Sequence, residues 1–323
     1  MRIGIIGTGK HGSRYAHHIV NDVAGLELAA ISRRSPEGID QGAGWNCSWY
    51  ENWQELVADN RVEAVVAVVP PVLNPDIARA CGDAGKPLLL EKPLAVSSRA
   101  AREIVRRFAG KKLALTVGQT LRYNQVVQGL RKYLPDIGVL YSLSANQRLE
   151  PSLLSWHEDP HQAGAGVSFH TAVHVFDAIR FITGMEIRRV MAVSRKHHSR
   201  TLEDVLAVLL EMDNGIVGTI DCSKVGRARS GRFDFVGKKG QLHGEQVHNI
   251  LEHIQDMQVE RLETGEPAST IVHLLQDWSE FLAGQAPNPI PAEEGLAAVR
   301  LCEACLESSQ SGRWVDVFDS EQV

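Results

Sequence analysis

The amino-terminal segment of the chain constrains its fold more than any other stretch. An apolar run that starts at Arg2 ends at a glycine, and Gly7, Gly9 and Gly12 complete the pattern G-x-G-x-x-G. In a strand-turn-helix unit the first glycine allows a tight turn, the second lets backbone approach a pyrophosphate, and the third lets the helix pack close to the strand. A helix beginning near Lys10 then offers free N–H groups and the positive end of its dipole to phosphates. The sequence therefore predicts dinucleotide binding, with a merely structural turn as the alternative.

The end of the second predicted strand bears on which dinucleotide is bound. Leu26–Ser32 has the pattern of a strand, and Ser32 lies 20 residues after the last glycine, where folds of this kind contact the adenosine ribose. An NAD site places Asp or Glu there, but positions 28 to 36 hold no acidic residue. Ser32, Arg33 and Arg34 suit a 2′-phosphate, so we expect NADP(H) to be preferred, with NAD(H) possible. The alternative is a solvated basic loop.

Alternating strands and helices continue to about residue 122. The apolar, β-branched run Val62–Val69 is typical of a central parallel strand that is buried on both faces. Further strands are expected at Pro87–Leu90 and Leu113–Val117, with helices near residues 75–85 and 98–109. This alternation predicts an α/β Rossmann domain, a doubly wound parallel sheet, over residues 1–122.

The pattern changes beyond residue 122. Strands are expected at Val139–Arg148, Ile187–Ser194, Asp204–Met212, Gly215–Ser223 and Arg232–Val236, and helices near residues 125–133, 170–183, 269–283 and 292–308. Residues 123–323 are therefore predicted to form an α+β domain with a largely antiparallel, open-faced sheet. An uncovered sheet face predicts a homodimer or homotetramer assembled through it.

Composition excludes several classes of protein. The formal net charge of −5 gives no sign of a nucleic-acid surface, and no apolar run approaches the roughly 20 residues of a membrane span. Because a strand is predicted at the very start, we expect no secretory signal. The five cysteines are scattered, which favours reduced thiols in a cytoplasm. Cys302 and Cys305 form a C-x-x-C within a helical pattern, where core packing is the expected role and redox or zinc chemistry the alternative.

Three motifs together indicate a family. They are the glycine pattern, Glu91-Lys92-Pro93 after a predicted strand, and Gly164-Ala165-Gly166 leading to His174 and Asp177. Two weaker features, Glu203-Asp204 before a strand and the run 236–240, agree with them. Over nearly its whole length the chain resembles the Gfo/Idh/MocA oxidoreductases, which oxidise or reduce sugars, inositols and related polyols with a nicotinamide cofactor. The resemblance implies a small carbohydrate, polyol or glycoside as substrate.

Lys92 has a chemical argument of its own. Hydride transfer from an alcohol carbon requires removal of the hydroxyl proton by a base within about 3 Å of the oxygen. Lys92 follows a strand of the parallel sheet at its carboxyl end, where open α/β folds bind ligands. Its ammonium can polarise a carbonyl or hold an alkoxide there. The alternative is an ordinary surface lysine.

Two histidines lie four residues apart on a predicted helix. His170 and His174 would share one face, with Asp177 close by. The resemblance implies that His174 is catalytic, whereas the first position is usually Asp in the family and is His170 here. A neutral His170 can accept or relay a proton but does not supply a fixed negative charge. An alternative treats the two histidines as a metal pair joined by His157, Glu158 or His161; no metal is expected.

The candidate site is therefore drawn from both domains, with the site in the cleft between them. The catalytic candidates are Lys92, His174 and His170; the cofactor-binding candidates are Gly7, Thr8, Gly9, Lys10, His11, Gly12, Ser32, Arg33, Arg34, Pro70, Glu91 and Lys92; the substrate candidates are Trp156, His157 and Asp177. The alternative functions are a nucleotide-sensing regulator that has kept the fold without turnover, and an enzyme with tightly bound, recycling NAD(P).

Overall fold

The computed structural model describes residues 1–318 and divides the chain into two compact units. The first comprises Met1–Thr120 together with Ser269–Leu296, and the second comprises residues 121–268 together with those from 297 onward. This division differs from a single boundary at residue 122, because the chain returns to the first unit late in the sequence. Such a return depends on tertiary packing, for which local composition gives no signal.

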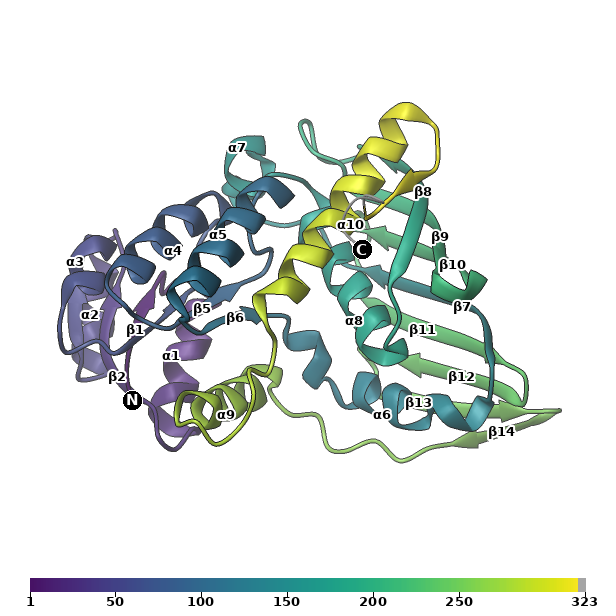
Figure 1. Ribbon diagram of the computed structural model, residues 1–323, viewed down its shortest axis with the longest axis horizontal. Helices are drawn as coiled ribbons and strands as arrows, with labels where there is room; N and C mark the ends of the chain where they lie inside the picture. Colours follow the sequence, from purple (N-terminus) through teal and green to yellow (C-terminus); the bar gives the residue numbers. More distant parts are fainter. Residues whose placement is uncertain (319–323) are drawn as a thin grey trace. The chain divides into compact units, whose positions relative to one another are not determined.

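A parallel sheet of six strands forms the centre of the first unit, in the order β3-β2-β1-β4-β5-β6 (Figure 1). The strands are β1 (Arg2–Ile6), β2 (Glu27–Ser32), β3 (Ser48–Tyr50), β4 (Ala64–Ala67), β5 (Leu88–Glu91) and β6 (Leu115–Gly118). The helices are α1 (Gly12–Asn21), α2 (Glu37–Gly44), α3 (Trp53–Ala58), α4 (Asn74–Asp83), α5 (Ser98–Lys111) and α9 (Thr270–Leu282). Strand order reverses beside β1, which pairs in parallel with both β2 and β4. The predicted doubly wound sheet is confirmed, and ligands of such sheets bind at the carboxyl ends of the strands beside this reversal.

The returning segment completes the first unit at two places. α9 packs on α1, where Ser269 Oγ lies 2.9 Å from His18 Nε2, and Trp278 of α9 is fully buried. Farther along, the Asn288 side chain accepts a hydrogen bond from Thr116 Oγ1 of β6 at 2.8 Å. The segment therefore covers one helix and lines the edge strand of the sheet.

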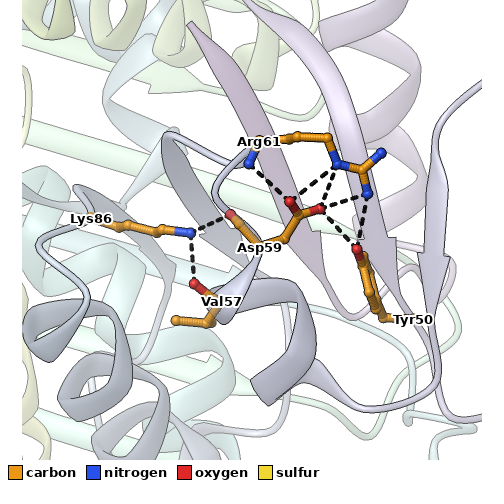
Figure 2. Close-up of polar contacts among 5 residues, drawn as sticks. All are labelled: Tyr50, Val57, Asp59, Arg61 and Lys86. Atoms are coloured by element: carbon orange, nitrogen blue, oxygen red, sulfur yellow. Dashed lines mark hydrogen bonds and ion pairs between the residues drawn. The ribbon is translucent and has the colours of Figure 1, made fainter.

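A polar network fixes the connection from α3 to β4 (Figure 2). The Asp59 carboxylate accepts hydrogen bonds from the backbone N–H and guanidinium of Arg61 and, at 2.8 Å, from the Tyr50 hydroxyl. The buried Lys86 ammonium donates to the carbonyls of Val57 and Asp59 at 2.6 and 2.7 Å. These carbonyls lie at the carboxyl end of α3, where helix carbonyls lack partners within the helix. The Arg61 hydrogen bonds hold the pKa of the Asp59 carboxyl well below its ordinary value.

Lys86→Met should destabilise the protein while keeping the aliphatic stem in place. The substitution leaves the Val57 carbonyl without its Lys86 donor, whereas the Asp59 carbonyl keeps the Val62 N–H at 3.0 Å. An unsatisfied buried acceptor costs about 1–3 kcal/mol, measured as the free energy of unfolding in urea. Lys111→Met is the control, because Lys111 forms a partly exposed ion pair with Asp83 at 2.9 Å, and such pairs contribute no more than about 1 kcal/mol. Equal unfolding midpoints for wild type and Lys86→Met would contradict the capping role.

A nine-stranded sheet forms the centre of the second unit, in the order β14-β13-β12-β11-β7-β10-β9-β8-β15. Its strands are β7 (Leu140–Arg148), β8 (Ile187–Arg195), β9 (Val205–Met212), β10 (Val217–Ser223), β11 (Ser230–Gly237), β12 (Gly240–Glu245), β13 (Ile250–Gln255), β14 (Gln258–Arg261) and β15 (Val315–Asp316). The helices are α6 (Gln125–Tyr133), α7 (Pro160–Ala163), α8 (Val173–Thr183) and the part of α10 (Ala292–Ser311) from residue 297 onward. Neighbouring strands are antiparallel except β7 and β10. The predicted largely antiparallel sheet is confirmed, and β12 to β14 extend it beyond the predicted strands.

The two faces of this sheet differ. α6 and α8 lie against one face (Figure 1). Side chains that point to the opposite face are left exposed. Val193, Leu209 and Val217 are 48%, 49% and 55% exposed, whereas Leu210 and Ile220 are buried. The sheet is therefore open-faced, with apolar side chains on its uncovered side.

Four of the five cysteines have the character of core residues, and Cys47 is partly exposed. All five are free thiols, and Cys302 and Cys305 are fully buried. Cys302 Sγ lies 3.1 Å from the Ser168 carbonyl oxygen, so the C-x-x-C pair belongs to the core of the second unit. Burial raises the pKa of Cys81 and Cys222 to about 12, which keeps both thiols protonated and unreactive.

Over residues 1–318, none of the helices combines the length and apolarity that crossing a bilayer requires.

Candidate active site

The glycine turn of the first unit has the geometry that a pyrophosphate site needs. Gly7 has φ +91°, and a Cβ there would lie 2.3 Å from the Val68 carbonyl oxygen. A Cβ at Gly12 would lie 1.9 Å from the Gly7 carbonyl oxygen, whereas a Cβ at Gly9 would meet nothing within 4 Å. Two of the glycines are therefore required by packing, and the third borders open space at the start of α1, which has no side-chain cap. A dinucleotide phosphate fits this arrangement.

Hydrogen bonds to one carbonyl hold the glycine turn in place. The carbonyl oxygen of fully buried Thr8 accepts from Arg33 Nη1 at 3.0 Å, Ser13 Oγ at 3.0 Å and Gln41 Nε2 at 3.2 Å. Thr8 Oγ1 donates in turn to Gln41 Oε1 at 2.6 Å. Arg33 thus supports the turn directly, a role that sequence reasoning did not assign to it. Gln41 was missed because it lies on α2, whose position beside the turn has no sequence signature.

The three residues predicted to contact the adenosine end differ in accessibility. Ser32 is 4% exposed at the end of β2, and Arg34 is exposed. Arg33 is 28% exposed at its side chain, donates to Ser35 Oγ at 2.7 Å and lies 3.6 Å from Glu37. Hydrogen bonding by Ser35 holds the pKa of Glu37 below its ordinary value. Glu37, the first acidic residue after β2, is therefore already paired with Arg33.

Glu91 joins the glycine turn to Lys92. Its carboxylate, 6% exposed at the end of β5, accepts hydrogen bonds from Tyr15 at 2.6 Å and from the Lys92 backbone N–H at 3.0 Å. It also lies 2.8 Å from Nε2 of His11, which belongs to the turn. Burial raises the pKa of Glu91, but His11 and Lys92 outweigh that effect and hold the pKa below its ordinary value. Burial and Glu91 together raise the pKa of Tyr15, so its hydroxyl remains a donor.

The chain beyond Lys92 is held by a buried amide. Asn74 Nδ2 donates to the carbonyls of Pro93 and Leu94, each at 3.2 Å, and Asn74 is 1% exposed. The Lys92–Pro93 peptide bond is cis. Lys92 itself is half-buried, as is Pro70 at the end of the segment that follows β4. The predicted cofactor residues of the first unit thus lie on the glycine turn, at the last residues of β2 and β5, and on the loops after β2, β4 and β5.

In the second unit a buried carboxylate orders the loop that leads to the histidines. Glu203 Oε1 accepts from the backbone N–H of Gly166 at 2.9 Å and of Ser168 at 3.1 Å. The Glu203 carbonyl accepts from Val167 N–H at 2.8 Å. A Cβ on Gly166 would lie 1.9 Å from that carbonyl oxygen. Only glycine allows this approach, which accounts for one glycine of the 164–166 motif.

The helix that carries the histidines begins differently from the prediction. Residues Ser168–Ala172 form a π-helical turn, and the α-helix proper starts at Val173. His170 lies in the π turn and His174 in the first turn of α8, and both are half-buried. The predicted helix over residues 170–183 is confirmed, but its first residues belong to a π turn that the sequence pattern did not indicate. π turns within helices occur frequently at functional sites.

Two predicted substrate residues lie against His170. The ring centroids of His157 and His170 are 3.7 Å apart, and those of Trp156 and His157 are 4.0 Å apart. Lys224, which sequence reasoning missed, has its Nζ 2.9 Å from His170 Nδ1. The structure thus brings together an aromatic and basic cluster around His170.

Asp177 has a different environment from the predicted one. Its carboxylate is fully buried and accepts from Arg122 Nε at 2.8 Å and Arg122 Nη2 at 2.6 Å. A bidentate pair of this kind occupies both oxygens and fixes the side-chain geometry. The predicted substrate contact by Asp177 is not supported by this geometry, because the carboxylate is inaccessible. Asp177 instead anchors α8 one turn after His174.

The residues of the alternative metal site are not among those that the structure groups at metal-binding distances. Within residues 1–318, the one group of three His, Cys, Asp or Glu side chains whose ligand atoms all lie within 4.8 Å of one another is His17, His18 and Asp22. That group excludes the histidines of the second unit. It lies on α1, where both nitrogens of His18 already have partners, Asp22 at 2.6 Å and Ser269 at 2.9 Å.

Gly166→Ala should destabilise the second unit strongly. The added Cβ meets backbone rather than a movable side chain, so the loop and Glu203 must separate and two buried amide hydrogen bonds weaken. We expect a loss of at least about 2–3 kcal/mol in the free energy of unfolding, measured in urea. Gly226→Ala is the matched control, since its Cβ would approach nothing closer than 3.9 Å. Similar stabilities for the two variants would refute the close approach.

Family comparisons cover most of the chain. Residues 1–119 match the model described as the oxidoreductase family, NAD-binding Rossmann fold. Residues 136–317 match the C-terminal alpha/beta domain of the same oxidoreductase family.

Similar proteins of known activity include inositol dehydrogenases. Inositol 2-dehydrogenase 1 of Saccharopolyspora erythraea is 27% identical over 98% of this chain and 96% of its own length. Inositol 2-dehydrogenase of Rubrobacter xylanophilus is 26% identical over 96% of this chain and 91% of its own length.

Solved structures share the fold at lower identity. Levoglucosan dehydrogenase in complex with NADH has a TM-score of 0.89 and 21% identity, covering 98% of this chain and 99% of that one. Aldose-aldose oxidoreductase from Caulobacter crescentus, complexed with glycerol, has a TM-score of 0.88 and 19% identity, covering 98% and 99% of the two chains.

Proposed function

The chain belongs to the Gfo/Idh/MocA family of oxidoreductases, and from that premise we propose how it transfers a hydride between a nicotinamide and a sugar, polyol or glycoside. The reaction interconverts a hydroxyl and a keto carbon of the substrate. One observation carries the proposal. Buried Glu91 contacts both His11 of the glycine turn and the Lys92 backbone N–H. One carboxylate therefore connects the predicted phosphate site to the predicted catalytic lysine.

NADP(H) is the proposed cofactor, with NAD(H) as a weaker ligand. When bound, the nicotinamide supplies the hydride donor or acceptor. The glycine turn and the start of α1 would hold the pyrophosphate, and Ser32, Arg33 and Arg34 would hold the adenosine ribose with its 2′-phosphate. Exposed Arg34 is the principal phosphate contact, because Arg33 is already bonded to the Thr8 carbonyl and paired with Glu37. A guanidinium binds a 2′-phosphate in bidentate fashion.

Calorimetric titration of both oxidised cofactors tests this preference. A charge-assisted contact contributes roughly 1.5–3 kcal/mol, so NADP should bind about ten- to a hundredfold more tightly than NAD. Arg34→Ala should narrow the gap and leave NAD affinity unchanged, whereas Arg33→Ala should also weaken NAD by loosening the glycine turn. Equal affinities, or tighter binding of NAD, would contradict the assignment.

Lys92 and His174 are the proposed catalytic residues. In the oxidative direction the Lys92 ammonium stabilises the developing alkoxide, and a neutral His174 takes the hydroxyl proton. His170, with His157 and Trp156 against it, positions the substrate hydroxyl. Asp177 acts only through Arg122, holding α8 and hence His174 in place.

Steady-state kinetics on the best substrate of a polyol and aldose panel measure these roles. Lys92→Met should lower kcat on the order of 10²–10³-fold, and His174→Gln on the order of 10²–10⁴-fold, while both variants bind cofactor as wild type does. Lys238→Met, an exposed lysine of the second unit, is the control and should keep full activity. A folded Lys92→Met protein with normal turnover would reduce Lys92 to a surface residue.

Two alternatives make different predictions. A nucleotide-sensing regulator of the same fold binds cofactor and turns over no sugar or polyol. An enzyme with tightly bound, recycling NAD(P) purifies with cofactor and needs a second substrate to return the hydride. Absorbance of the purified protein and the dependence of turnover on added cofactor distinguish these cases.

Self-association through the open sheet completes the proposal. The exposed Val193, Leu209 and Val217 form an apolar strip on three neighbouring strands, and apolar strips of this kind are usually covered. A homodimer or homotetramer in the cytoplasm covers it with a second copy of the same face. A monomeric mass by light scattering at micromolar concentration would contradict this assembly.

A further inference from the structure

His170 is held by a lysine from a different part of the second unit. Lys224 follows the last residue of β10, and its Nζ lies 2.9 Å from His170 Nδ1. Its backbone N–H donates to the Asp204 carbonyl at 2.8 Å. The neighbouring Glu203 orders the loop that enters the π turn of His170. The dipeptide 203–204 therefore fixes both partners of the contact.

The donor inventory assigns a direction to this hydrogen bond. A lysine ammonium has three N–H donors and no acceptor, so Lys224 donates and His170 Nδ1 accepts. A neutral imidazole has one N–H, which must then be on Nε2. A second proton on His170 would place two positive charges within hydrogen-bond distance, which disfavours the imidazolium. The His157 ring lies against the His170 ring, with centroids 3.7 Å apart and planes tilted by 58°, and this contact restricts ring rotation.

We propose that Lys224 is a positioning residue that holds His170 as the neutral Nε2–H tautomer. In this tautomer Nε2 carries the proton, so His170 does not act as the base, which leaves proton acceptance to His174. Accepting or relaying the proton, the role predicted for His170 from the sequence, requires a lone pair at Nε2 that this tautomer lacks. The inference rests on the proposed function for its consequence in catalysis, but the tautomer itself does not.

Nitrogen NMR of the cofactor-saturated protein, labelled with ¹⁵N in its 13 histidines, reads the tautomer directly. The His170 signals are those lost in His170→Ala. In wild type, Nδ1 should have the shift of an unprotonated nitrogen and Nε2 that of a protonated one. In Lys224→Met the two shifts should move toward each other as the tautomers exchange, and Lys224→Arg should restore the wild-type pattern. A protonated Nδ1 in wild type, or an unchanged spectrum in Lys224→Met, would overturn the proposal.

Kinetics test the consequence for catalysis. Lys224→Met should lower kcat/KM about 10–100-fold, the range found when the outer partner of a ligand histidine is removed from a metal site, and Lys224→Arg should recover most of it. In a His170→Ala background, Lys224→Met should have no further effect, because the lysine acts through that ring. Full additivity of the two substitutions would contradict action through His170. If wild type turns over no substrate, the proposed function fails while the NMR result stands, so the two failures are distinguishable.

Discussion

Each unit contains a buried carboxylate. The hydrogen bonds that offset the cost of its burial can form only when the functional loops lie where they do. A carboxylate removed from water is costly unless several donors surround it. Glu91, at the end of β5, finds its donors in Tyr15, in the Lys92 backbone and in His11 of the glycine turn. Glu203, just before β9, finds them in the amides of Gly166 and Ser168. The hydrogen bonds that offset the burial of these carboxylates are the same hydrogen bonds that order the loops.

The second unit adds a further constraint on the helix that carries His174. Asp177 and Arg122 form a bidentate pair with 0% and 11% side-chain exposure. Removing one partner of such a pair costs about 3–5 kcal/mol, because the other charge remains buried. The helix start is thus held on one side by Glu203 and on the other by Asp177. Neither carboxylate reaches the substrate, yet both determine where the histidines lie.

Local sequence was sufficient where local chemistry decides the structure. The glycine pattern predicted the turn at Gly7 because steric exclusion of a Cβ leaves few other arrangements, and the β-branched run predicted β4 because such strands are buried on both faces. Long-range partners had no such signal. Asp177 lies 55 residues from Arg122, and Ser168 lies 35 residues before Glu203, so the ion pair and the π turn required the structure. The lysine beside His170 comes from after β10 and was invisible for the same reason.

The most direct test of the central assignment is turnover itself. The purified protein is mixed with NADP or NAD and a panel of inositols, aldoses, anhydrosugars and sugar acids, and the absorbance of the reduced nicotinamide is followed. We expect formation of reduced cofactor with at least one cyclic polyol or sugar, faster with NADP, and a slower rate when the reacting C–H is replaced by C–D. Tight cofactor binding with no reduction of it by any member of the panel, and no reverse reaction with the corresponding keto sugars, would contradict hydride transfer and favour a nucleotide-sensing protein.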